Sequence, residues 1–106
     1  MTTLTNKTAL ITGASRGLGL ALATELARRG WRLIINARGA EALETAQTAL
    51  AHHTDVVALP GDVSDKNHRK ALVEAAREFG GLDAVVNNAG ILGPSSLSER
   101  TTKGVS

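Results

Sequence analysis

Three closely spaced glycines, Gly13, Gly17 and Gly19, mark the segment of this sequence that is best suited to bind a charged ligand. The segment is Thr12-Gly-Ala-Ser-Arg-Gly-Leu-Gly19, between a short apolar run and an amphipathic stretch. Phosphate groups bind where backbone N–H groups converge at the N-terminus of a helix. Such a site would use Gly13 for the turn, Gly17 for close approach to the phosphates and Gly19 for close helix packing. The segment could equally be an ordinary strand-to-helix turn, because 11 glycines in 106 residues make chance clusters common.

The elements that must position this loop alternate between short apolar runs and longer amphipathic stretches. Apolar runs at 8–12, 31–36, 56–59 and 82–87 predict four strands. Apolar residues at helical spacing predict helices at 18–29, at 40–53, and from a cap at Ser64 or Asp65 to about residue 79. Strands that alternate with helices pair in parallel through right-handed crossovers. We therefore predict an α/β fold over residues 1–90 and a loop-like tail over residues 91–106.

Composition excludes several classes of function. The net charge is +2 and the cations are scattered along the chain. With one Trp, one Phe and no Tyr, the chain has few aromatic side chains on which bases could stack, so we expect no nucleic-acid partner. The absence of cysteine is compatible with a reducing compartment. The polar first seven residues do not resemble a signal peptide, and no apolar stretch could span a membrane, so we expect a cytoplasmic protein. His52, His53 and His68 form no metal-binding set.

Four segments together resemble the short-chain dehydrogenase/reductase family, over about residues 5–97. Besides the glycine segment, they are Asn36-Ala-Arg38 at the end of the second predicted strand, Gly61-Asp-Val63 after the third and Asn87-Asn-Ala-Gly90 after the fourth. Each lies at the carboxyl end of a strand, where an open α/β sheet binds its ligand. The resemblance implies an incomplete Rossmann-type, doubly wound parallel sheet of about four strands in the order 3-2-1-4. Its first two helices would cover one face and its third helix the other.

The resemblance also implies a nicotinamide dinucleotide as ligand and assigns roles to matching positions. The glycine segment would hold the phosphates and the adjacent ribose. Asp62 would accept a hydrogen bond from the adenine amino group with Val63 beside the ring. The ribose side would be lined by Asn88, Ala89 and Gly90, and Asn87 would be structural. Asp62 and the two asparagines could instead be ordinary turn residues. The expected cofactor-binding residues are Gly13, Ala14, Ser15, Arg16, Gly17, Leu18, Gly19, Arg38, Asp62, Val63, Asn88, Ala89 and Gly90.

The end of the second predicted strand favours NADP(H) over NAD(H). An NAD site places an acid there for the ribose 2′-hydroxyl, whereas this chain offers Arg38, with Arg16 nearby in the glycine segment. Guanidinium groups bind a 2′-phosphate through charge-assisted hydrogen bonds. Arg38 could also be a solvated residue at a helix entry.

The residues that transfer hydride in the family are not all represented. Family members use a Tyr acid/base whose pKa a nearby Lys lowers, and this chain contains no tyrosine. We therefore expect no catalytic residues here and no hydride transfer by this chain alone. It would be the NADP(H)-binding part of such an oxidoreductase, truncated before the catalytic Ser, Tyr and Lys. The alternatives are a non-catalytic NADP(H)-binding or interaction module, or a non-functional truncated product. An uncovered sheet face beside the third helix would favour self-association or a partner chain.

Overall fold

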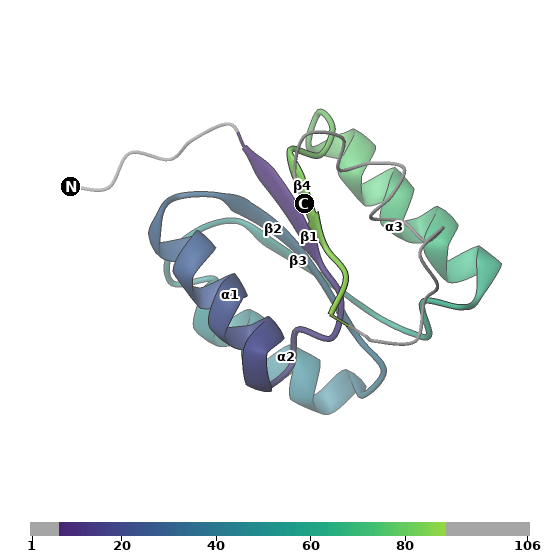
Figure 1. Ribbon diagram of the computed structural model, residues 1–106, viewed down its shortest axis with the longest axis horizontal. Coiled ribbons are helices and arrows are strands. Elements are labelled where there is room, and N and C mark those ends of the chain that lie inside the picture. Colours follow the sequence, from purple (N-terminus) through teal and green to yellow (C-terminus); the bar gives the residue numbers. More distant parts are fainter. Residues whose placement is uncertain (1–6, 89–106) are drawn as a thin grey trace.

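The structure is a computed structural model that describes residues 7–88 (Figure 1). Along the chain, strands and helices alternate. They are β1 (Thr8–Ile11), α1 (Gly17–Arg28), β2 (Arg32–Ala37), α2 (Ala40–Leu50), β3 (Val56–Pro60), α3 (Lys66–Glu78) and β4 (Ala84–Val86). The predicted tail at 91–106 lies outside the described residues.

The four strands form one parallel sheet in the order β3-β2-β1-β4, which confirms the predicted topology. Leu10 of β1 lies opposite Ile34 of β2 on one side and opposite Val85 of β4 on the other. Ile34 in turn lies opposite Val57 of β3. Because the strands are parallel, their carboxyl ends all meet at one edge of the sheet.

The helices cover the two faces unequally: α1 and α2 lie together on one face and α3 lies on the other (Figure 1). Successive residues of a strand point to opposite faces. Ile11 and Ile35 therefore pack in the cluster under α1 and α2, whereas Leu10 and Ile34 pack with Leu72 of α3. Burial on both faces explains why these strands are continuous apolar runs in the sequence.

Most element ends lie within one residue of the predicted bounds, and the larger differences are in α2 and β4. Helix α2 ends at Leu50 instead of residue 53, and the chain continues in a turn in which His53 N donates to Leu50 O at 2.9 Å. Strand β4 comprises Ala84–Val86 instead of 82–87. Just before it, the Asp83 N–H donates to Thr8 O at 2.8 Å, and the Asp83 carboxylate accepts from Thr8 N at 2.9 Å. Helix α3 begins with Asp65 as its cap, which decides between the two predicted residues.

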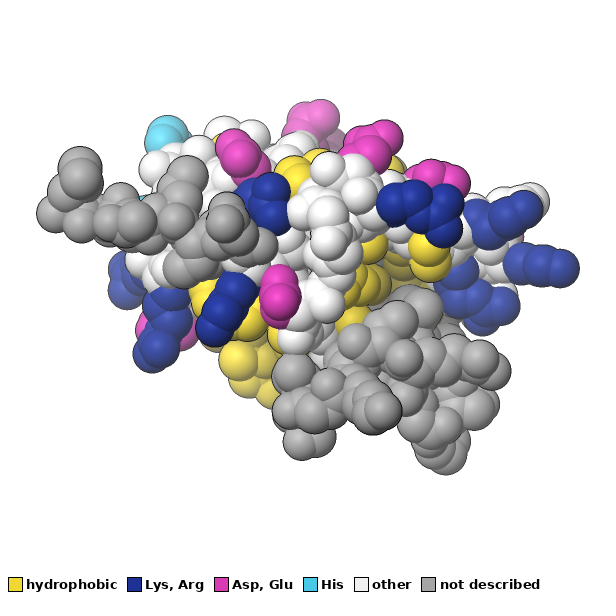
Figure 2. All heavy atoms as spheres, turned by 90° about the horizontal axis from the view of Figure 1, so that it is seen from above, with side chains coloured by type: hydrophobic (Ala, Val, Ile, Leu, Met, Phe, Trp, Pro, Cys, Tyr) yellow, Lys and Arg dark blue, Asp and Glu magenta, His cyan; other side chains and the backbone are white. Residues whose placement is uncertain are grey.

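On the face that Figure 2 shows, Lys and Arg side chains gather at the end of the molecule that carries α3, and others lie at the opposite end. The first half of α3 supplies Lys66, Arg69 and Lys70. In the described part of the chain, no helix is both long enough and apolar enough to cross a lipid bilayer.

Candidate functional site

A cleft of about 560 Å³ opens at the carboxyl edge of the sheet. Gly13 follows β1, Arg38 follows β2, Val63 follows β3 and Asn88 follows β4, and all four line this cleft. The structure thus brings together segments that are up to 75 residues apart, at the edge where the sequence predicts them.

The loop between β1 and α1 presents the N-terminus of α1 to the cleft. Gly13 and Gly17 have φ values of 62° and 61°, a left-handed conformation that glycine adopts without strain. The N-cap residue Arg16 is extended and provides no side-chain acceptor, and the first turn of α1 contains no acidic residue. The first backbone N–H groups of a helix lack intrahelical partners, and the helix dipole adds a partial positive charge there. This end of α1 is therefore suited to an anionic group.

Gly19 allows the start of α1 to lie against the loop that precedes it. A Cβ atom at Gly19 would overlap the carbonyl oxygen of Gly13 and lie 2.8 Å from Nδ2 of Asn88. The neighbours of Gly19 are thus the loop after β1 and Asn88, in the segment after β4. Any larger residue would push the helix N-terminus away from the cleft.

A hydrogen-bond network around Thr12 joins this loop to the segment after β4. The Thr12 hydroxyl accepts from the backbone N–H of Asn88 at 2.9 Å and lies 3.1 Å from Oδ1 of Asn87, to which it can donate. The Asn88 side chain donates to Gly13 O at 3.2 Å. Thr12 thus helps to position both asparagines: Asn87, for which a structural role was expected, and Asn88, which lies beside the loop. Sequence reasoning gave Thr12 no role, although a polar residue at the end of a buried strand was a usable signal.

Arg38 and Asp62 form an exposed ion pair at the side of the cleft. Nη2 of Arg38 lies 3.5 Å from Oδ2 of Asp62, with 70% and 44% of the two side chains exposed. The other carboxylate oxygen accepts from the backbone N–H and the hydroxyl of Ser64, at 2.9 and 2.8 Å. These bonds from Ser64 are the main cause of the lowered pKa of Asp62; desolvation opposes them, and the charge of Arg38 and, when His68 is protonated, of His68 lowers this pKa further. Asp62 is therefore a charged acceptor that partly neutralises Arg38. The sequence alone did not predict this ion pair.

The predicted site residues divide into three groups. The cleft is lined by Gly13, Ser15, Arg16, Gly17, Leu18, Arg38, Val63 and Asn88. Ala14 and Gly19 are buried behind it, and Asp62 is placed beside it by its pair with Arg38. Ala89 and Gly90 lie outside the described residues. The lining also includes four residues that were not predicted as site residues, namely Asn36, Ala37, Gly39 and Gly61.

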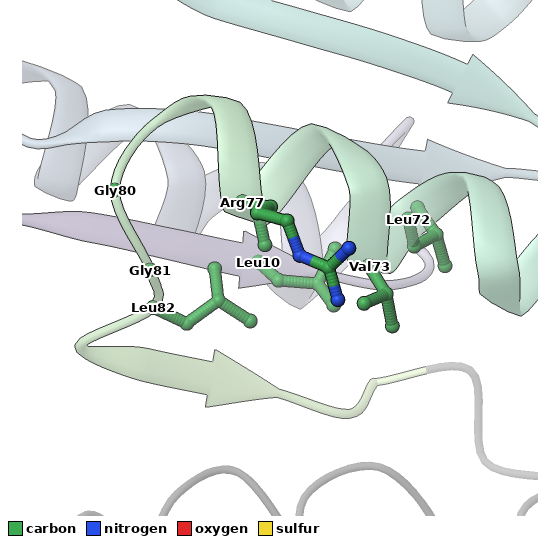
Figure 3. Close-up of a pocket in the computed structure, with 8 residues that line it drawn as sticks. Leu10, Leu72, Val73, Arg77, Gly80, Gly81 and Leu82 are labelled. Atoms are coloured by element: carbon green, nitrogen blue, oxygen red, sulfur yellow. The ribbon is translucent and has the colours of Figure 1, made fainter.

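A second hollow of about 530 Å³ lies between α3 and the β4 side of the sheet (Figure 3). It is an apolar groove lined by Leu10, Leu72, Val73 and Leu82 together with Ala76, the turn Gly80-Gly81 and Arg77. Its walls offer one charged group and no acid, so it lacks the polar groups that bind and activate a small substrate. Among residues 7–88, no cluster of His, Asp or Glu side chains is arranged to hold a metal ion.

Comparison with known proteins identifies one family. The model of the short chain dehydrogenase family matches residues 7–105. Versicolorin reductase 1 from Aspergillus parasiticus is 41% identical over 101 aligned residues, and the match covers 92% of this chain and 38% of the relative. L-Sorbose reductase from Gluconobacter frateurii, solved with NADPH and L-sorbose, is 35% identical with a TM-score of 0.75. This match covers 92% of the present chain and 38% of the reductase chain. An NAD⁺-bound xylitol dehydrogenase is 32% identical with a TM-score of 0.76, and the match covers 85% of this chain and 35% of that one. The sequence therefore spans about two fifths of the length of these relatives.

Proposed function

Because the chain belongs to the short-chain dehydrogenase family, we propose that its cleft binds NADP(H) as the cofactor-binding part of an oxidoreductase. The observation that carries the proposal is the N-terminus of α1. This helix end faces the cleft and has no side-chain cap, and two arginines, Arg16 and Arg38, line the same cleft. A dinucleotide offers phosphates to such a site, and the fold places that site at the carboxyl edge of the sheet.

The residues present fit the parts of the cofactor. The N–H groups of the loop at residues 13–19 would hold the pyrophosphate, and Asn88 would line the ribose side. Asp62 is ionised and retains acceptor capacity for the adenine amino group, while Val63 and the 66%-exposed Leu18, which both line the cleft, offer apolar surface. Ala89 and Gly90, outside the described residues, are proposed to extend the ribose side. When bound, the nicotinamide ring supplies or accepts the hydride.

The preference for NADP(H) over NAD(H) is part of this proposal. Arg16 and Arg38 line the cleft, and none of the residues that line it is acidic. A hydrogen bond to a charged group contributes about 1.5–3 kcal/mol, whereas solvent screens the exposed Arg38–Asp62 ion pair, so this pair contributes little. A 2′-phosphate should therefore compete well with Asp62 for binding to Arg38. One such contact favours NADP(H) by about ten- to a hundredfold, since 1.4 kcal/mol corresponds to tenfold.

Calorimetric titration with NADPH and NADH tests the proposal. We expect NADPH to bind the unmodified chain more tightly, and Arg38→Asp to reverse the order because it exchanges the cation for an acceptor of the ribose 2′-hydroxyl. Arg28→Asp is the matched control, since Arg28 is exposed in the last turn of α1, about 16 Å along the helix from the cleft. Equal affinity of the unmodified chain for both cofactors would contradict the preference, and NADPH binding that Arg38→Asp and Arg28→Asp weaken alike would contradict the site.

Hydride transfer itself requires a group that this sequence does not contain. The family resemblance assigns proton transfer to a tyrosine, and the chain has none. We propose that these residues provide the binding step and no turnover with carbonyl substrates on their own. NADPH oxidation measured at 340 nm on a panel of aldehydes and ketones checks this, and turnover that Arg38→Asp abolishes would refute it. The cytoplasmic location remains a prediction from composition.

A second candidate function is self-association, which the apolar groove beside α3 favours. Val73 is 44% exposed on its rim, and β4 is the last strand of the sheet in the described part of the chain. We propose that two copies associate through this face, because edge strands and apolar surface both promote pairing. Sedimentation of the unmodified chain and of Val73→Glu should show dimers or larger species that the substitution reduces. A compact monomer at high concentration would rule this out.

A further inference from the structure

His68 lies behind the cleft, at a position that neither the predicted nor the observed lining includes. It is half-buried in the first turns of α3 and faces the segment where β2 and β3 end. Its ring contacts two residues that do line the cleft, Asn36 and Gly61. α3 thereby reaches the wall of the proposed cofactor site from the outside.

The orientation of the Asn36 amide is determined by its surroundings. The side chain is only 2% exposed, and its Nδ2 atom donates to Leu59 O at 3.3 Å and to Gly61 O at 3.1 Å. Backbone carbonyl oxygens can only accept, so the amide nitrogen, and not the amide oxygen, must point toward them. The same nitrogen lies 2.7 Å from Nε2 of His68.

The NH2 group has two hydrogens, which these three neighbours share. Because this nitrogen can only donate, Nε2 of His68 is an acceptor and carries no proton. In the neutral ring the proton then resides on Nδ1. A protonated ring would direct an N–H group against the amide N–H group of Asn36. The contact is therefore compatible with one protonation state and one tautomer of His68.

The imidazole also occupies the space beside the glycine of the Gly61-Asp-Val63 segment. A Cβ atom at Gly61 would lie 2.5 Å from Nδ1 and 2.7 Å from Cε1 of His68. The ring thus packs directly on this backbone, while Gly61 N donates to Ala37 O at 2.9 Å on the other side. Gly61 is held between the end of β2 and the ring.

We propose that His68 is a positioning residue for the adenine end of the cleft. Its neutral imidazole accepts from Asn36 and packs on Gly61, and in this way it fixes the turn that carries Asp62 and Val63. The role in binding depends on the proposed function, whereas the hydrogen bond and its tautomer do not.

Charged groups on several segments surround the ring. Asp62, on the segment after β3, attracts a positive charge on His68, and Arg38, after β2, pairs with Asp62 and repels one. On the segment of His68 itself, Asp65 caps the helix, and Lys66, Arg69 and Lys70 add positive charge. Protonation of His68 would remove its hydrogen bond with Asn36 and add an attraction to Asp62. The Asp62 carboxylate is already bound by Arg38 and Ser64. The turn should therefore loosen when His68 becomes charged.

The first test needs no cofactor. Long-range ¹H–¹⁵N correlation spectra of the full chain, assigned by comparison with His68→Gln, should show His68 as the Nδ1–H tautomer. The Gly61 amide resonance should shift with the titration of His68 in the unmodified chain and stay constant over that range in His68→Gln, whose side-chain oxygen can replace Nε2 as acceptor. His52→Gln is the matched control, because His52 is exposed in the turn after α2. An Nε2–H tautomer, or a Gly61 shift that persists in His68→Gln, would overturn the proposal.

The second test measures binding of adenosine 2′,5′-bisphosphate, the adenine half of NADP, by calorimetry. We expect His68→Leu, which cannot accept a hydrogen bond, to weaken binding about tenfold, and His68→Gln to retain it. Binding should also fall with protonation of His68 in the unmodified chain and not in His68→Gln. Equal weakening in the Leu and Gln variants would overturn the positioning role. If the unmodified chain binds neither the bisphosphate nor NADPH, the proposed function fails, and the spectra then decide the proposal for His68.

Discussion

Replacement of Gly19 by alanine is the most direct perturbation of the loop that the proposed function depends on. The added methyl group would overlap the carbonyl oxygen of Gly13 and lie 2.8 Å from Nδ2 of Asn88. Neither neighbour is a flexible side-chain end that can turn away, because one is backbone and the other is held by its own bond to Gly13 O. Helix α1 must therefore move back from the loop.

The size of the effect follows from three contributions. The Asn88–Gly13 hydrogen bond contributes about 0.5–1.5 kcal/mol, and forcing a methyl group into a packed region costs about 1–3 kcal/mol. Alanine regains up to about 1 kcal/mol over glycine through its helix propensity, and less than that in a first turn. We expect a net loss of about 1–4 kcal/mol in the free energy of unfolding, although a Gly→Ala change inside a helix normally stabilises.

Urea unfolding followed by the fluorescence of Trp31 measures this loss, because Trp31 is the sole tryptophan and packs against the core under α1 and α2. Gly39→Ala is the matched control. Gly39 has an ordinary φ of −85° and no heavy atom within 4 Å of the added Cβ, so its substitution should change stability by less than about 1 kcal/mol. If Gly19→Ala were as stable as the unmodified chain, the close approach of α1 to the loop would not exist and our account of the cleft would be wrong.

Three further predictions concern the segments around the cleft. Thr12→Val should lower the free energy of unfolding by about 1–3 kcal/mol in urea, because it leaves the half-buried backbone N–H of Asn88 without its acceptor, and Thr12→Ser should lose less. Asp65→Ala should cost about 1 kcal/mol in the same measurement through loss of the α3 cap, whereas Asp65→Ser should retain most of it. The folded-state pKa of Asp62 is lowered, so its stabilisation is complete above its ordinary value of 3.8 and is lost as the pH falls through the lower folded value. Thermal unfolding of Asp62→Asn should therefore depend less on pH in this acid range than that of the unmodified chain, and parallel curves would contradict the assignment.

The sheet and the order of its elements could be predicted because each central strand is buried on both faces. Leu10 and Ile11 face opposite layers and are both apolar, so the strand is visible in the sequence as an uninterrupted run. Element ends were less predictable. The Ala-rich pattern of α2 continues past Leu50, and only backbone geometry separates the helix from the turn that follows it.

The choice of the α3 cap shows why local sequence is insufficient. Ser64 and Asp65 are both good N-cap residues. Ser64 instead donates to Asp62, which leaves Asp65 to accept from Asn67 N at 2.8 Å. The decision therefore depends on a neighbouring turn and not on the propensity of either residue.

The contacts that shape the cleft could not be predicted because they join residues far apart in sequence. Arg38 meets Asp62 only because the end of β2 pairs with the end of β3, with Ala37 opposite Pro60. Asn36 meets His68 through the same pairing and the return of the chain along α3. Motifs identified each segment alone, whereas the charge balance of the cleft depends on how these segments lie together.

The three helix N-termini of the described residues allow the two interpretations of the glycine segment to be compared. Helix α3 has an acidic cap in Asp65, and α2 carries Glu41 in its first turn, as expected for the positive end of a helix dipole. Helix α1 has neither and instead has Arg16 as its N-cap residue, so an uncompensated positive charge faces the cleft. An ordinary turn would gain about 0.3–1 kcal/mol from an acid at this place. A helix that forgoes this gain and adds a cation is better explained by an anionic ligand that provides the missing charge, as the phosphates of a dinucleotide would.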